Sequence, residues 1–115
     1  MARRRKTKRR LATPSGDQPT LTGVALLLSE TPADTLDLHG YSSAQAEVRL
    51  HDFLRTRSID SGGRVLHVIT GRGLGSEGAP VLPPLVRELI AHDYAEYVAE
   101  SAGLPGGGAI AVRLR

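Results

Sequence analysis

From residue 35 onward, apolar and polar residues recur at regular spacing, and the pattern predicts short strands and helices in alternation. Residues 35–39, TLDLH, alternate at period two, as in a strand with one buried face. Residues 43–57 carry apolar side chains at helical spacing, and Ser42 with Gln45 makes a capping-box pattern at the start of this helix. Residues 64–70, RVLHVIT, are almost continuously apolar and β-branched, which is typical of a central strand covered on both faces.

The remaining pattern predicts a loop, a second helix and two further strands. Residues 71–80 contain four glycines and form the loop. Residues 81–90 show a second helical stripe, in which two prolines are tolerable only in the first turn. Residues 95–101 alternate again, and residues 109–115 close the chain as the last strand.

The predicted order of elements is therefore β-α-β-α-β-β. Each β-α-β unit should cross over right-handed and make a parallel pair, while the last two strands can form an antiparallel hairpin. Two helices can cover one face of a four-stranded sheet. The sequence thus predicts an α/β two-layer sandwich with a mixed four-stranded sheet, two helices on one face and the other face at least partly open.

The segment before this domain differs from it in charge and composition. Residues 1–20 are predicted to be a basic arm and linker, residues 21–34 a short helix or apolar strap, and residues 35–115 the folded domain. The chain has 15 basic and 12 acidic residues, but the first ten positions hold seven of the basic ones and no acidic one, which leaves the rest with a net charge of −4. The seven are Arg3, Arg4, Arg5, Lys6, Lys8, Arg9 and Arg10.

Such a run of like charges without apolar partners predicts an arm that is disordered when free. A polyanion could order it through phosphate neutralisation and counterion release; the alternative is a tail that only improves solubility. Cysteine is absent, which excludes disulfides and thiolate metal sites. No segment has the length of a membrane span, and no cleavage site follows the short apolar run at 21–28, so we expect a cytoplasmic protein.

Candidate chemistry begins with Asp37 and His39, which lie two positions apart on the first predicted strand. Residues two apart project from the same face of a strand, here away from Leu36 and Leu38 and close to the turn at Gly40. A carboxylate beside an imidazole can fix its tautomer for general-base work, or the pair can bind a divalent metal ion. The simpler alternative is an outward histidine that bonds to a neighbouring loop.

The glycine-rich loop is the second candidate. Between a strand and a helix, its backbone N–H groups can bind an anion, and Arg72 adds a planar cation suited to phosphate. Gly73, Gly75 and Gly78 spell GxGxxG, but about 80 residues cannot hold two mononucleotide-binding halves, and no GxxxxGK[ST] is present, so we expect no nucleotide cofactor. The alternative is a loop whose glycines only permit tight turns.

Other histidines and glycines carry weaker signals. The glycines at 106–108 can let the backbone approach the other loops closely, or they simply form a hairpin. His67, in the middle of an apolar strand, is more typical of a core histidine than of a catalyst. His51 and His92 lie on predicted helices without an evident role.

Taken together, LDLHG at 36–40, HVITGRG at 67–73 and GGGAIAVRL at 106–114 resemble the Smr (small MutS-related) domain over residues 35–115. This resemblance implies a sandwich like the C-terminal domain of bacterial translation initiation factor three. It also implies binding of DNA or RNA and, in many members, endonuclease activity. The alternative is a non-catalytic module for nucleic acid or the ribosome.

The family's LDxH motif falls on residues 36–39 and its TGxG motif on Thr70, Gly71, Arg72 and Gly73. The resemblance also raises the expectation that His67 faces the site. We therefore expect Asp37 and His39 to be catalytic, the TGRG residues and the basic arm to contact phosphates, and Asp37 to help hold Mg²⁺ or another divalent ion where a metal is used.

Overall fold

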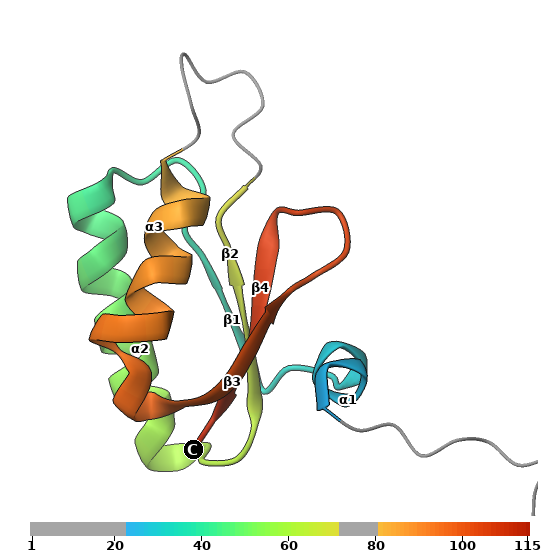
Figure 1. The fold of residues 1–115 in the computed structure, drawn as a ribbon. Coiled ribbons are helices and arrows are strands. Elements are labelled where there is room, and N and C mark those ends of the chain that lie inside the picture. The colour runs from blue at the N-terminus through green and yellow to red at the C-terminus, as the bar shows by residue number, and fades with distance from the viewer. Residues whose placement is uncertain (1–22, 72–80) are drawn as a thin grey trace, which may run out of the picture.

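The computed structural model describes residues 23–71 and 81–115, which form a four-stranded sheet with helices against both faces (Figure 1). Helices α2 and α3 lie on one face and α1 on the other. The strands are β1 (Asp34–Asp37), β2 (Val65–Ile69), β3 (Val98–Gly103) and β4 (Ala109–Leu114), and the helices are α1 (Gly23–Ser29), α2 (Ser43–Asp60) and α3 (Leu82–Glu88). A π-helical turn at Leu89–Asp93 and a 3₁₀ turn at Ala95–Tyr97 connect α3 to β3.

The predicted two-layer sandwich is confirmed, but one predicted strand pair is wrong. β1 pairs parallel with β2, and β3 pairs antiparallel with β4, as expected. The order across the sheet is β1-β2-β4-β3, so β2 pairs with β4 rather than with β3. The reason is burial: most of β4 is buried and takes a central place, whereas β3, after the buried Val98, alternates between exposed and half-buried residues and suits an edge.

Helix α2 begins and packs as its sequence pattern predicts. The Ser42 hydroxyl accepts a hydrogen bond from the Gln45 N–H, and the Gln45 side chain accepts one from the Ser42 N–H, which closes the capping box. One stripe, Ala46, Leu50 and Leu54, is fully buried against the sheet. The helix runs three residues past the predicted end at residue 57.

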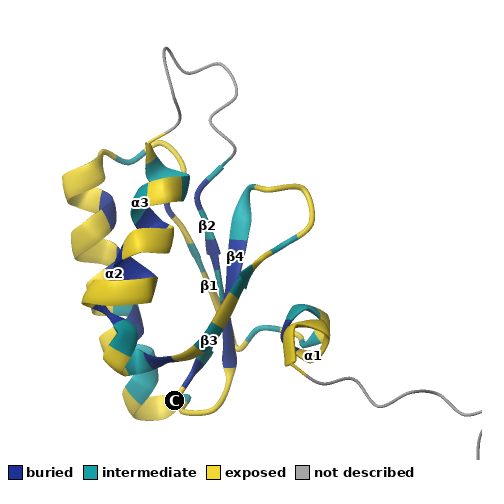
Figure 2. Ribbon diagram, viewed as in Figure 1, coloured by how far each residue is buried: buried dark blue, intermediate teal, exposed yellow. Residues whose placement is uncertain are grey.

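The main core lies between the sheet and the layer of α2 and α3, where Figure 2 shows the buried residues gathered. Leu36 of β1 packs against this core, and Leu38, the first residue after the strand, is fully buried in it, so both leucines face the helices as predicted. The two prolines of α3 lie in its first turn, where their missing N–H groups break no helical hydrogen bond.

The third strand begins three residues later than predicted. Residues 95–97 form a 3₁₀ turn, closed by a hydrogen bond from the Tyr97 N–H to the Tyr94 carbonyl. Tyr94 is buried and stacks on His51 of α2, with ring centroids 5.0 Å apart. Because this packing keeps residues 94–97 against the helix layer, the strand begins only at Val98.

The second face of the sheet is partly covered by α1, which lies within the segment where a helix or strap was expected. Leu27 of α1 is fully buried against Val65 and Ala111. Arg113 of β4 fastens the segment, because its guanidinium lies 2.7 Å from a Glu30 carboxylate oxygen and donates to Glu100 at 3.0 Å. These contacts, led by the hydrogen bond to Glu100, raise the pKa of Arg113.

His67 lies on this second face, since it pairs with Ala111 across β2 and β4. Its Nε2 atom is buried and has no hydrogen-bond partner within the described residues. Burial lowers the pKa of His67, because the charged imidazolium would lose its hydration there. The fold therefore favours the neutral form of His67.

This burial predicts that the domain loses stability on acidification. The unfolded chain takes up a proton near pH 6.5, whereas folded His67 does so only at lower pH, so the stabilising effect is present above about pH 6.5 and is lost as the pH falls through the folded pKa. We expect the free energy of unfolding to fall between pH 8 and pH 5, and to fall less in His67→Leu. Urea titrations across this range would measure it, and equal slopes for both proteins would contradict the prediction.

Candidate active site at the carboxyl ends of β1 and β2

Asp37 and His39 lie at the carboxyl end of β1, and two neighbouring residues fix their position. Leu38 is fully buried, and its N–H donates to the Ile69 carbonyl of β2 at 2.7 Å. Gly40 follows with a φ of +84°, a backbone conformation that favours glycine, and turns the chain toward α2. Because Leu38 points into the core, Asp37 and His39 project from the opposite face.

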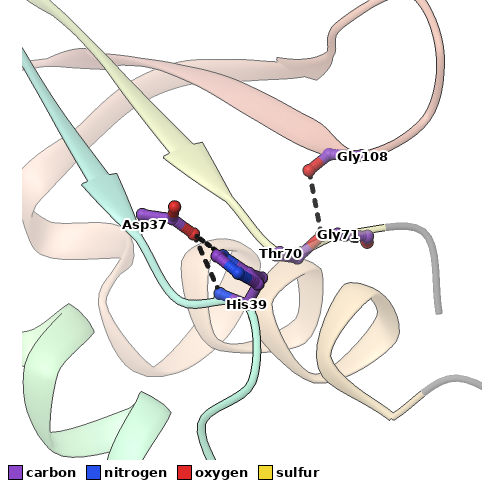
Figure 3. Close-up of polar contacts among 5 residues, drawn as sticks. All are labelled: Asp37, His39, Thr70, Gly71 and Gly108. Carbon is purple, nitrogen blue, oxygen red and sulfur yellow. Dashed lines mark hydrogen bonds and ion pairs between the residues drawn. The ribbon is translucent and has the colours of Figure 1, made fainter. Parts of the chain in front are cut away.

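The two side chains contact each other directly (Figure 3). His39 Nδ1 lies 2.6 Å from Asp37 Oδ1, and the same oxygen accepts the His39 backbone N–H at 3.0 Å. The hydrogen bond from the imidazole is the main reason that the pKa of Asp37 is lowered, so this carboxyl group stays ionised. An ionised Asp37 favours the tautomer with a proton on Nδ1, which leaves the Nε2 lone pair of His39 free to accept a proton.

The TG corner, which we define as Thr70 and Gly71, lies beside His39 at the end of β2. Gly71 has a φ of +74°, and a Cβ placed on it would lie only 3.5 Å from the His39 Cβ. The DLH and TG segments are thus brought together at one edge of the sheet, as the sequence predicts. His39 remains open to solvent, with 71 % of its side chain exposed, and 49 % of the Asp37 side chain is exposed.

The glycine-rich hairpin between β3 and β4 reaches the same corner. The Gly108 carbonyl accepts the N–H groups of Thr70 at 2.9 Å and Gly71 at 3.1 Å. The Thr70 hydroxyl donates to the Gly71 carbonyl at 2.9 Å and lies 3.4 Å from the Gly108 carbonyl. Thr70 is only 5 % exposed. The amides of Thr70 and Gly71 are therefore both bonded to Gly108. The hydroxyl of the buried Thr70 further stabilises the corner.

The predicted site residues divide into two groups. Asp37, His39, Thr70 and Gly71 come together, and their arrangement is compatible with a site for one phosphate group. Arg72, Gly73 and the seven basic residues of the arm lie outside the described residues, so their predicted phosphate contacts stay predictions.

A metal ion would find few protein ligands at this edge. In residues 23–71 and 81–115 no cluster of three or more His, Cys, Asp or Glu side chains has the arrangement of a metal site. Among the described residues, nothing bonds to Asp37 Oδ2 or His39 Nε2, which are the donor atoms of the pair that a metal ion could use. Mg²⁺ is often held by one or two carboxylates together with substrate phosphates and water, so Asp37 fits as a single ligand that needs substrate oxygens to complete the shell.

Two features of the site were missed by sequence reasoning. Gly108 was expected only to approach the other loops, whereas its carbonyl holds both amides of the TG corner; no local pattern encodes this register. Arg49 of α2 lies over the ring of Tyr41, with the guanidinium carbon 4.5 Å from the ring centroid. The sequence could have pointed to Arg49 only as a basic residue on the exposed side of α2, close to the turn that follows His39.

Comparison with known proteins agrees with this geometry. The Smr domain family model matches residues 36–115. A crystal structure of a human small-MutS related domain is 30 % identical, with a TM-score of 0.52 over 70 % of this chain and 99 % of that one. The solution structure of the B3BP Smr domain is also 30 % identical, with a TM-score of 0.53 over 73 % of this chain and 80 % of that one. No curated protein matches the chain.

Smr domains are associated with nucleic-acid binding and nuclease activity. Within the part of the chain that the structure describes, none of the helices has the length and apolar character needed to cross a membrane. The match of the family model covers most of the chain and includes both the DLH and TG segments. The chain therefore belongs to the Smr domain family.

Proposed function

We propose that this protein is an endonuclease that cuts the phosphodiester backbone of RNA or DNA, with His39 as the acid–base group and Asp37 as its orienting partner. The observation that carries this proposal is the 2.6 Å contact between Asp37 and His39 beside the TG corner. An exposed imidazole with a fixed tautomer can exchange protons with a substrate whose phosphate lies against the corner.

On RNA, the attacking group is the 2′-hydroxyl next to the scissile phosphate. His39 Nε2 takes the hydroxyl proton, the 2′-oxygen forms a bond to phosphorus, and the bond from phosphorus to the 5′-oxygen breaks. The leaving 5′-oxygen then takes a proton from the imidazolium that His39 has become, or from water. Asp37 stabilises the positive charge that develops on His39 during this step.

On DNA, the attacking group is water, because the 2′-hydroxyl is absent. A divalent ion at Asp37 would supply Lewis-acid activation of the phosphate and lower the pKa of a bound water. In that case, His39 accepts or returns a proton on the same side of the phosphate, and the TG corner limits where the phosphate can lie.

The phosphate contacts follow from which groups are free. The amides of Thr70 and Gly71 are used by Gly108, so these residues shape the phosphate site rather than supply its main donors. In this proposal, Arg72 and the amide of Gly73 contact the phosphate, and the basic arm adds sequence-independent affinity for the rest of the strand.

The proposal is tested by incubating purified protein with labelled RNA and DNA of the same sequence, with and without EDTA. Cleavage of RNA that persists in EDTA and disappears when the 2′-hydroxyls are replaced by hydrogen supports the 2′-hydroxyl route. Cleavage of both polymers that stops in EDTA supports the water and metal route. Binding without any cleavage would overturn the nuclease proposal and favour a non-catalytic module for nucleic acid or the ribosome.

Deleting residues 1–10 is expected to weaken binding of an oligonucleotide and to flatten its salt dependence. The slope of log K against log salt is negative. For every phosphate that the shortened protein no longer neutralises, the magnitude of this slope should decrease by about 0.7 on a single strand and by about 0.9 on duplex DNA. Fluorescence anisotropy at several salt concentrations measures both effects. A protein without the arm that binds with unchanged affinity would show that the arm is only a solubilising tail.

A further inference from the structure

A cleft of about 220 Å³ lies between α2 and the edge strand β1, whose carboxyl end leads into Asp37 and His39. Leu36 of β1 and Phe53 of α2 supply its apolar side chains, and Arg49 lines it as well. The volume is below the roughly 300–1,000 Å³ of pockets for drug-sized molecules, so the cleft suits one small planar group. β1 is an edge strand of the described sheet, so this side of it is open to a ligand.

Arg49 differs from the other cations near the cleft because it makes no ion pair within the described residues. Arg57 lies 3.3 Å from Asp60 and 3.9 Å from Asp34, and Arg55 lies 2.9 Å from Asp52. The acidic residues that line the cleft, Asp34 and Asp52, are thus already near other arginines. Arg49 is exposed, so its guanidinium is accessible to a ligand.

The Arg49 guanidinium also lies against an aromatic ring. It lies over the Tyr41 ring, 4.5 Å from the centroid, and Tyr41 packs partly against the main core. The Tyr41 N–H donates to the Leu38 carbonyl at 3.1 Å, which fixes the turn between β1 and α2. An arginine stacked on an aromatic ring presents a flat cationic surface, and a nucleobase can stack on such a surface.

The cleft and the candidate active site share the same short stretch of chain. Tyr41 follows His39 by two residues, so their Cα atoms are at most about 7.6 Å apart. Leu36 and Asp37 are neighbours on β1, with Leu36 facing the helix layer and Asp37 the opposite face. A strand whose phosphate lies at His39 can therefore bend around the edge of β1 and bring its next base to the cleft.

We infer that this cleft binds the nucleobase next to the scissile phosphate, with the base against Leu36 and Phe53 and stacked on Arg49. This subsite rests on the proposed function, since it takes part of the same substrate strand. Its occupant must be unpaired, because a base in a duplex cannot enter a cleft at the edge of a sheet. The subsite therefore selects single-stranded or locally opened nucleic acid.

The test compares Arg49 with an exposed arginine outside the cleft. Binding of a single-stranded oligonucleotide is measured by fluorescence anisotropy in a His39→Ala background, which prevents cleavage. Arg49→Ala is expected to raise Kd about tenfold, as for the loss of one stacked base, and Arg49→Lys to recover only part of this loss because lysine keeps the charge without the plane. Arg87→Ala removes an exposed arginine from α3, outside the cleft, and should leave Kd nearly unchanged.

A second measurement excludes a merely structural effect of Arg49. Abasic sites are introduced one at a time along the oligonucleotide, and one position should weaken binding to the protein with Arg49 clearly more than binding to Arg49→Ala, in which only Leu36 and Phe53 still contact the base. Equal effects of Arg49→Ala and Arg87→Ala, full recovery in Arg49→Lys, or an abasic effect of the same size with and without Arg49 would each overturn the subsite. Failure of every variant to bind nucleic acid would instead overturn the proposed function itself.

Discussion

Replacing His39 by alanine is expected to slow cleavage by about 10²–10⁴-fold, which is the usual contribution of a positioned acid–base group. The loss should appear in kcat, because in the proposed mechanism His39 exchanges protons with the substrate and does not supply most of the affinity. Single-turnover cleavage of a labelled substrate, with Kd measured separately, would distinguish the two. Asp37→Asn should also slow the reaction, since an amide no longer favours the tautomer with a proton on Nδ1.

The matched control for this substitution is His92→Ala. His92 is also exposed, and it lies 3.6 Å from a carboxylate, that of Glu88, so it has the same general chemistry outside the site. It should retain the rate of the unmodified protein. A rate that is unchanged in His39→Ala would remove His39 from the mechanism, while an equal loss in both variants would indicate a general effect on the domain.

The second large effect concerns stability. Leu50→Ala is expected to lower the free energy of unfolding by about 2–5 kcal/mol, because Leu50 is fully buried between α2 and the sheet and its truncation leaves a cavity. A domain of this size has a total stability of about 5–15 kcal/mol, so this one change removes a large part of it. Urea denaturation followed by circular dichroism measures the difference.

Val48→Ala provides the control on the same helix. The Val48 side chain is 70 % exposed, so its truncation should change stability by no more than about 0.5 kcal/mol. If Leu50→Ala were as mild as Val48→Ala, α2 would not pack against the sheet through the Ala46, Leu50 and Leu54 stripe. The architecture that positions Tyr41 and Arg49 would then be wrong as well.

The parts of the fold that local pattern determines were predictable. The period-two alternation of β1 correctly separated Leu36 and Leu38 from Asp37 and His39, because residues two apart on a strand share a face. The capping box at Ser42 correctly located the start of α2, since its two hydrogen bonds join residues only three positions apart. Short-range geometry was sufficient in both cases.

The parts that depend on long-range pairing were not predictable. Nothing in β3 or β4 alone indicates that β4 inserts beside β2, because this depends on comparing the burial of both strands in the finished sheet. The bonds from Thr70 and Gly71 to Gly108 likewise depend on the register between β2 and β4. The Arg49–Tyr41 pair depends on how the turn after β1 meets α2.

The Gly108 carbonyl has a consequence for the order in which the site is assembled during synthesis. β1 and β2 leave the ribosome before β4, so a partly synthesised chain can contain Asp37, His39 and the TG corner while the acceptor of the two corner amides is still absent. The corner becomes anchored only when β4 joins the sheet beside β2. An incomplete nascent chain therefore lacks the anchored TG corner that the proposed phosphate site needs.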